Sequence, residues 1–151
     1  MERQRKIILI CSAVVVAIAF YCYNPFALYF QNDDFIHIPL SANGELLQRN
    51  TFRPVCDLSI MLDYYLWGKN AYGYHLTNLI LHIICTILVF LLSRDFYNKY
   101  AHAKGVRFAF ITSLIFLLYP MHSEAVFWIL GRSAILGCIF FLLSIISFLK
   151  R

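Results

Sequence analysis

Four runs of apolar residues, separated by segments rich in charge and proline, set the organisation of the chain. The runs cover residues 7–23, 72–93, 108–119 and 133–149. About 20 residues of α-helix cross the hydrocarbon core of a bilayer, so we expect about four transmembrane helices. The run at 108–119 is short, because its 12 residues reach about 18 Å of a roughly 30 Å core. To cross the membrane, this helix must include flanking residues; otherwise it lies buried beside the neighbouring helices.

The first run has two interpretations. It follows the basic start MERQRK, as the core of a secretory signal peptide would. A signal core is shorter, however, and ends at a small-residue cleavage site. This run ends in Tyr21, Tyr23 and Phe26, which suit the membrane interface, so we interpret it as a retained anchor.

The segment 24–71 breaks the apolar pattern and predicts a loop. It contains Pro25, Pro39, Pro54 and an Asn43-Gly44 turn signal. Inside it, residues 54–67 predict a helix, since apolar residues recur there at a spacing of three or four. These residues are Val55, Leu58, Met61, Leu62 and Tyr65, with Asp57 and Asp63 off the stripe. The helix lies either along the membrane surface or against the rest of the loop.

Composition agrees with a membrane protein. The chain is 61% apolar and 14% charged, with a mean hydropathy of +0.68. A soluble domain is about 45–50% apolar and about 25% charged. These values exclude a disordered chain, a nucleic-acid-binding arm and an ordinary cytosolic enzyme. The fold class expected is an all-α integral membrane protein with one transmembrane domain.

The distribution of charge predicts the orientation. Suppose that the N-terminus is in the cytoplasm. The cytoplasmic segments are then the two ends and the connector 94–107, and they hold 9 of the 13 Lys and Arg residues. The outer segments are the loop 24–71 and the turn 120–132, and they hold 6 of the 8 acids. Cytoplasmic loops carry the excess of basic residues. The net charge of +5 is therefore a topology signal, and we expect lipid and not nucleic acid as the partner of the basic surface.

Most local motifs of soluble enzymes are missing from the sequence. It contains no Gly-rich nucleotide-binding motif and no paired-cysteine metal spacing. Of its five cysteines, Cys22 and Cys56 alone can meet on the outer side, so no disulfide framework is expected.

An acidic pair, Asp33-Asp34, follows the first run closely. Near a membrane surface, one carboxylate can act as a general base on a hydroxyl while its neighbour orients it or raises its pKa. Asn-Asp-Asp is also ordinary loop composition, so a solvated turn is the alternative.

The second run carries a polar stripe. His75, Asn78, His82 and Thr86 fall within about 80° of one another on a helix. Polar side chains inside a span usually face the bundle interior or a wet cavity. The stripe either contacts a ligand or holds neighbouring helices by hydrogen bonds.

The turn at 120–132 brings an imidazole, a carboxylate and a guanidinium close together in sequence. His122 and Glu124 can bind a substrate or relay an acceptor proton, and Arg132 can hold a phosphate with two hydrogen bonds. Alternatively, the turn is interfacial and Arg132 extends to the lipid headgroups.

Taken together, these motifs resemble a known family. The order is NDD at 32–34, Arg53-Pro54, GYHLTNLILH at 73–82 and YPMHSEAVFWILGR at 119–132. This order resembles the N-terminal part of the transmembrane-and-TPR O-mannosyltransferases and their bacterial relatives in the GT-C class. Tyr119 stands where that group has histidine. The resemblance implies a helix bundle with an extracytoplasmic active site, which moves a sugar, often mannose, from a polyprenyl-phosphate carrier to a hydroxyl.

The resemblance also implies roles for individual residues. Asp33 would be the catalytic base and Asp34 would support it. The residues that would bind the donor phosphate or shape the site are Arg53, His122, Glu124 and Arg132, with His75 and Asn78 as further candidates for donor contact. The acidic pair alone does not form the oxygen cage that a divalent cation requires, so no metal site or other cofactor is assigned.

Two functions remain open from the sequence. One is a glycosyltransferase module; the other is a non-catalytic scaffold or assembly subunit that keeps the ancestral bundle. The family has more spans than this chain, which predicts that the chain is an N-terminal portion working with further helices or a partner subunit. The bacterial inner membrane is the expected location, or the endoplasmic reticulum in a eukaryote.

Overall fold

The computed structural model describes residues 28–31, 33–43, 53–100 and 105–149. Over these ranges the structure is helical and contains no strand. The first apolar run, 7–23, lies outside the described residues. The helices, in order, are α2 (Asp34–Ala42), α3 (Pro54–Trp67), α4 (Ala71–Tyr100), α5 (Gly105–Leu118), η2 (Pro120–His122), α6 (Ser123–Phe127), η3 (Ile129–Gly131) and α7 (Arg132–Leu149).

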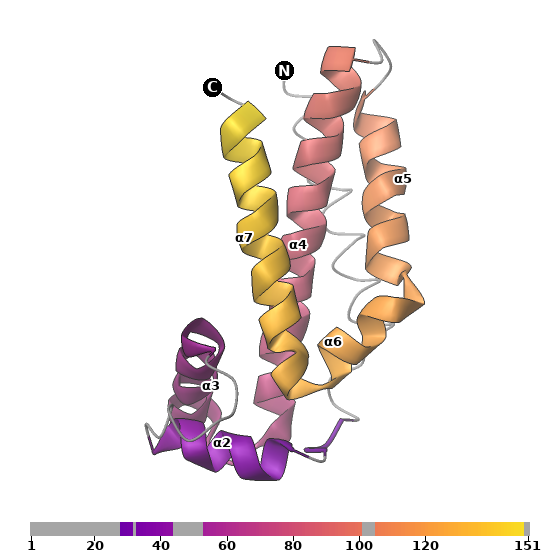
Figure 1. Cartoon of the computed structure of the whole chain (residues 1–151). Helices are drawn as coiled ribbons and strands as arrows, with labels where there is room; N and C mark the ends of the chain where they lie inside the picture. The colour runs from indigo at the N-terminus through magenta and orange to yellow at the C-terminus, as the bar shows by residue number, and fades with distance from the viewer. Residues whose placement is uncertain (1–27, 32, 44–52, 101–104, 150–151) are drawn as a thin grey trace.

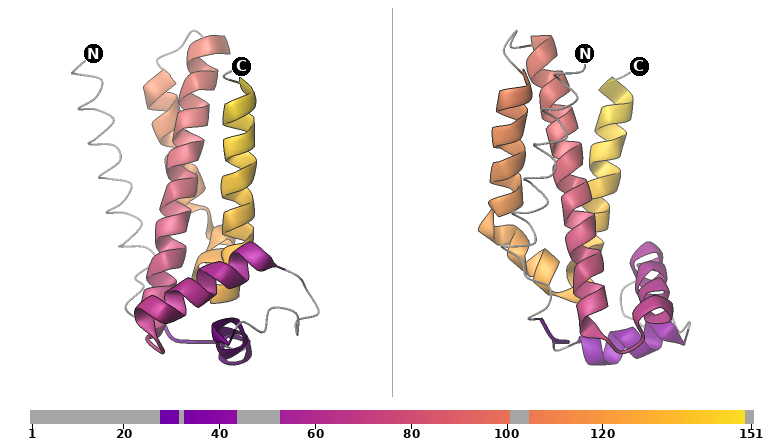
Figure 2. Two further views of the ribbon diagram at one scale, coloured as in Figure 1. Left: turned by 90° about the vertical axis from the view of Figure 1, so that its left-hand side faces the viewer. Right: turned by 180° about the vertical axis from the view of Figure 1, so that it is seen from behind.

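Three long helices form the bundle. α4 lies between α5 and α7 and packs against both, while α2 and α3 gather at one end (Figure 1). The views from the side and from behind show the same arrangement (Figure 2). We call this the site end: α2, α3, the segment 120–131 and the first turns of α4 and α7. The chain is thus an all-α membrane protein, as the sequence predicts.

Two of the described helical segments are long and apolar enough to cross a membrane, Ala71–Tyr100 and Ile129–Leu149. The short run at 108–119 gains residues at its start, since α5 begins at Gly105. It ends before Pro120, where the chain bends by 51° into the segment Pro120–Phe127. A proline cannot donate the next helical hydrogen bond. If the bent pair is a single broken span, the described part has three crossings.

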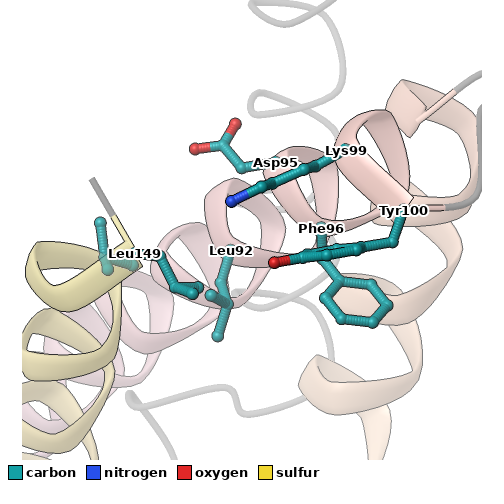
Figure 3. Close-up of a pocket in the computed structure, with 7 residues that line it drawn as sticks. Leu92, Asp95, Phe96, Lys99, Tyr100 and Leu149 are labelled. Carbon is teal, nitrogen blue, oxygen red and sulfur yellow. The ribbon is translucent and has the colours of Figure 1, made fainter. Parts of the chain in front are cut away.

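α4 continues beyond the predicted end of its run at Ser93. Tyr97 stacks on Phe108 of α5 with ring centroids 5.1 Å apart, and Phe96 packs on Tyr100 at 5.1 Å. These contacts stabilise helix in the part of the connector up to Tyr100. A cavity of about 60 Å³ lies between the ends of α4 and α7, where Lys99 Nζ is 5.2 Å from the Tyr100 ring centroid (Figure 3).

α2 is a helix that the sequence pattern does not predict. Pro39 lies inside it, which argues against helix from sequence alone. The Asp33 carbonyl starts the helix by accepting hydrogen bonds from the N–H groups of Ile36 and His37, at 3.1 and 2.9 Å. Ile38 is buried in a hydrophobic cluster with Ile60 of α3, so tertiary packing stabilises the helix.

α3 spans the residues 54–67 for which the sequence predicts a helix. The buried residues are Cys56, Asp57, Ile60 and Asp63. The apolar stripe faces outward, with Leu58 58% and Leu62 59% exposed. α3 packs on the loop through its inner face, where Ile60 shares a cluster with Ile38 of α2. Its outward apolar face also suits a helix on the membrane surface.

Candidate functional site

The sequence-predicted site residues lie on elements of the site end (Figure 1). Asp33 and Asp34 begin α2, Arg53 precedes α3, and His75 and Asn78 lie in the first turns of α4. His122 and Glu124 follow the bend after α5, and Arg132 starts α7.

The two members of the acidic pair have different surroundings. Asp33 is exposed, whereas Asp34 is 0% exposed. Asp34 Oδ2 accepts a hydrogen bond from the Gln31 N–H at 3.0 Å, and the Leu130 N–H also interacts with the buried carboxyl. Burial raises the pKa of the Asp34 carboxyl, and the charge of Asp33 raises it further, while the N–H groups of Gln31 and Leu130 oppose the shift.

Arg132 is the centre of a buried polar network. Its side chain is 0% exposed. Its Nε donates to Asn78 Oδ1 at 2.7 Å, and Nη2 donates to Asp63 Oδ2 at 2.5 Å and to the Tyr74 carbonyl at 3.1 Å. Nη1 donates to Ser59 Oγ at 3.3 Å. The guanidinium therefore connects α3, α4 and α7. Of its two predicted roles, this geometry favours shaping the site over holding a phosphate.

Asp63 is the anion of this network. Thr77 Oγ1 donates to Asp63 Oδ1 at 2.9 Å. Burial raises the pKa of the Asp63 carboxyl, and Arg132 and Thr77 oppose the shift without reversing it. The sequence pattern places Asp63 in the outer loop and does not assign it to the site. A buried arginine beside apolar segments needs an anion, and this is the signal that would have identified Asp63.

Asn78 fixes the turn that leads into α7. Its Nδ2 lies 3.3 Å from the Val126 carbonyl oxygen, 3.1 Å from that of Trp128 and 3.4 Å from that of Ile129. The Val126 carbonyl lies at the end of α6, where the helical pattern leaves backbone acceptors unused. The Trp128 and Ile129 carbonyls also accept from the N–H groups of Gly131 and Arg132. One amide thus binds the turn at 126–129 to α4.

The polar stripe of α4 faces protein and not lipid. His75, Asn78 and His82 are all at least 97% buried, since their exposed fractions are 1%, 0% and 3%. His82 Nε2 lies 3.4 Å from the Leu117 carbonyl of α5, and His75 Nε2 lies 3.2 Å from the Tyr29 carbonyl. His75 Nδ1 has no hydrogen-bond partner among the described residues. The stripe connects helices, as one interpretation of the sequence expected.

His122 and Glu124 lie apart from the Arg132 network. His122 Nδ1 donates to the Phe116 carbonyl at 2.9 Å, which leaves Nε2 of a neutral ring as an acceptor. Its ring packs against those of Phe116, His82 and Tyr119, with centroids 4.5, 5.6 and 5.4 Å away. Glu124 is exposed in the first turn of α6. The structure therefore groups these two residues with the bend after α5.

Arg53 is the exposed cation among the predicted site residues. Its Nη1 donates to Ser133 Oγ at 3.2 Å, so the start of α3 lies against the start of α7. Arg53 and Ser133 line an open hollow of about 260 Å³. Since this guanidinium keeps free donors toward solvent, it remains a candidate for a phosphate.

Metal ligands do not gather within the described residues. No group of three or more His, Cys, Asp and Glu side chains has a metal-binding arrangement there.

Comparison with known proteins identifies the relatives of this membrane protein. The chain is 34% identical to human protein O-mannosyl-transferase TMTC1 over 106 residues, which are 70% of this chain and 11% of the relative. It is 36% identical to Drosophila melanogaster protein O-mannosyl-transferase Tmtc1 over 128 residues, 85% of this chain and 14% of the relative. It is 32% identical to mouse protein O-mannosyl-transferase TMTC3 over 127 residues, 84% of this chain and 13% of the relative.

The relatives named are protein O-mannosyl-transferases, and the chain is similar to them over 70–85% of its own length. It spans roughly a seventh or less of the length of those relatives. No protein-family model and no solved structure matches it.

Proposed function

We propose that this chain is a membrane module of a glycosyltransferase that moves a hexose, mannose by analogy with the relatives' names, from a polyprenyl-phosphate donor to a hydroxyl acceptor. The observation that carries the proposal is the acidic pair at the site end, with one carboxylate exposed and one buried beside the turn at 129–131. Perturbed carboxyl groups in such positions are typical of functional sites.

The chemistry needs a base and a cation. A hydroxyl is a weak nucleophile near neutral pH, and the phosphate of the donor is already a good leaving group. In this proposal Asp33 removes the hydroxyl proton, Asp34 orients the pair, and Arg53 contacts the donor phosphate. His122 and Glu124 line the acceptor side, while Asn78, His75 and Arg132 hold the site end in shape.

We further propose that the site end faces away from the cytoplasm, as the charge distribution predicts. The relatives named above are animal proteins. They favour the endoplasmic reticulum membrane over a bacterial inner membrane as the location.

The test uses a chimera in which this chain replaces the matched segment of Drosophila Tmtc1, since the chain covers 14% of that protein. Membranes are given a polyprenyl-phosphate mannose carrying tritium and a Ser/Thr peptide. Asp33→Asn should lower transfer by about 10²–10⁴-fold, and Asp95→Asn, at the opposite end of α4, should not. Transfer that survives Asp33→Asn would favour the scaffold alternative, as would an inactive chimera alongside an active fly protein.

A further inference from the structure

The end of the bundle opposite the site end has a hollow that the proposed transfer does not use. We call this the far end: the last turns of α4 and α7 and the first two turns of α5. The hollow has a volume of about 470 Å³ and lies over α4, between Thr112 of α5 and Ile145 of α7. It shares part of its lining with the smaller cavity beside Lys99, namely Leu92, Phe96, Tyr100 and Leu149. We propose that the far end binds an anionic phospholipid, with an acyl chain in the hollow and the headgroup phosphate at Lys99.

The lining of the hollow changes along α4 in the same order as a phospholipid changes from headgroup to chain. Tyr97 and Tyr100 lie near the end of the helix, and Leu92 lies deepest. At the helical rise, Leu92 and Tyr100 are about 12 Å apart along the axis. Tyrosine is enriched at the membrane interface, because its ring is apolar and its hydroxyl is polar. Tyr97 stacks on Phe108 and Tyr100 packs on Phe96, so both rings are held in place at the mouth of the hollow.

Lys99 supplies a positive charge at this mouth. The neighbouring acid, Asp95, pairs with Arg94 at 2.7 Å, and Lys99 forms no ion pair within the described ranges. Its Nζ lies 5.2 Å from the Tyr100 ring centroid, and both side chains extend toward α7 (Figure 3). A cation at this distance from an aromatic ring is attracted to it. The ammonium is therefore held beside the cavity, where it is available to a phosphate.

The charge balance of the far end favours an anionic lipid. Arg94 and Asp95 cancel, which leaves Lys99 and the exposed Arg107 of α5 as an excess of positive charge among the described residues of this end. Basic pockets between transmembrane helices bind anionic headgroups. A zwitterionic headgroup would instead bring its own ammonium close to Lys99.

A lipid also fits the far end better than a further helix does. α4 and the segment Ile129–Leu149 are both long and apolar enough to cross a membrane, which places their ends near the height of the headgroups. A helix packed over the hollow would bury the Lys99 ammonium away from water. Burying a charge without an anion costs free energy, whereas a phospholipid supplies that anion.

Photo-cross-linking of the full 151-residue chain in phosphatidylcholine nanodiscs tests the proposal. The probe is phosphatidylserine with a diazirine in one acyl chain, and mass spectrometry should map its cross-links to the residues that line the hollow. Lys99→Gln should lower this cross-linking about fivefold, the attraction that one lysine near a membrane surface provides. Lys99→Arg should stay within about twofold of the parent, because it keeps the charge.

Two further variants separate the headgroup contact from the chain contact. Lys69→Gln is the matched control, since Lys69 is an exposed lysine at the site end, and it should cross-link as the parent does. Thr112→Phe places a ring in the hollow and should lower cross-linking to the hollow by the phosphatidylserine probe and by a phosphatidylcholine probe alike. Detergent melts of each variant check that the fold is kept.

Competitors and a second probe distinguish the alternative occupants. Unlabelled phosphatidylserine should displace the probe, and free glycerol 3-phosphate should not. Displacement by glycerol 3-phosphate would show a site for phosphate alone and overturn the proposal. Equal labelling by the phosphatidylcholine probe, or full labelling of Lys99→Gln, would overturn it as well, because the lipid would then be ordinary surrounding lipid. So would a hollow without cross-links in the parent, or full cross-linking of Thr112→Phe.

Discussion

At the scale of single residues, the carboxyl of Asp34 is a charged group that the fold buries outside the Arg132 network. It is 0% exposed, and burial raises its pKa although the N–H groups of Gln31 and Leu130 oppose the shift. A raised pKa means that the folded state binds more protons than the unfolded chain. Stability due to this group is thus full below the ordinary value of 3.8 and is lost as pH rises through the folded pKa.

Asp34→Asn should therefore stabilise the fold near neutral pH. We expect the free energy of unfolding to rise by about 1 kcal/mol, since the amide has no charge to desolvate, and the gain to disappear as pH falls toward the ordinary carboxyl pKa. Thermal melts in detergent over a pH series would measure it. Asp33→Asn, on an exposed carboxyl, should show no such gain, and a pH-independent gain at Asp34 would contradict the assignment to ionisation.

Arg132→Met should have the opposite effect. It leaves Asp63 buried without its cation, which costs about 3–5 kcal/mol. The double variant Arg132→Met/Asp63→Leu should recover much of that loss, because the unpaired charge is then gone. Denaturation in detergent compares them, with the exposed Arg107→Met as control. A double variant no more stable than Arg132→Met would show that the ion pair is not the source of the loss.

The pairing of Arg132 with Asp63 could not be predicted from the sequence. The motif placed Arg132 in the outer turn, and charge chemistry allowed both a phosphate contact and a shaping role. The sequence did not indicate that α3 turns its acids inward, because Asp63 lies 69 residues from Arg132 and only the fold brings them together.

At the scale of elements, the outward apolar face of α3 is the feature most specific to a membrane. Periodicity predicted the helix and its stripe, and a soluble protein would bury that stripe. Here the apolar stripe of α3 is exposed and its acids are buried. Lipid covering the outer face of α3 would explain this arrangement. α2 is not predicted from the sequence, because Pro39 inside it argues against a helix. Packing of α2 on α3 stabilises the helix all the same.

Leu62 should therefore contact lipid. A Leu62→Cys variant labelled with a fluorophore should be quenched strongly by lipids brominated near the headgroup region, because a surface helix seats its apolar face about 5–10 Å into that boundary. The same label at Asn70, in the exposed turn after α3, serves as the reference. Equal quenching at both positions would mean that α3 does not rest on the bilayer.

The turn between α6 and α7 depends on the small size of Gly131. A Cβ there would lie 2.8 Å from Ala125 Cα and 2.9 Å from the Ala125 carbonyl oxygen. Backbone cannot move aside as a side chain can, so Gly131→Ala should displace the turn that Asn78 binds and lower the free energy of unfolding by about 1–3 kcal/mol. Detergent melts would measure the loss.

Gly137→Ala is a matched control for that substitution. A Cβ at Gly137 meets nothing within 4 Å, and the residue lies inside α7. The change should be neutral or stabilise by about 0.5–1 kcal/mol, because alanine favours helix over glycine. A Gly131→Ala protein as stable as the Gly137→Ala protein would show that the turn tolerates the extra atom.

At the scale of the whole molecule, the gathering of motifs at one end follows from topology. Two successive helices that each run the length of the bundle, α4 and α5, return the chain to the end where α4 began, so Arg132 meets the residues near 33, 53 and 75. Hydrophobic runs and charge predict that much. They do not predict the inward turn of Asp34, the hollow at the far end or the pairing across α3, α4 and α7, which depend on how helices without sequence proximity pack.

The orientation of that end in the membrane is the last prediction. In the sequence, 9 of the 13 Lys and Arg residues fall in segments assigned to the cytoplasm, and such residues are retained in the cytoplasm during insertion. Asn43 is exposed beside α2, and Lys99 is exposed near the far end of α4. In sealed vesicles whose outer face is cytoplasmic, from a cysteine-free background, an impermeant maleimide should label Lys99→Cys and reach Asn43→Cys only after permeabilisation. The reverse pattern would place the acidic pair in the cytoplasm. A donor facing the opposite compartment would then be out of its reach, and the proposed transfer would fail along with the topology.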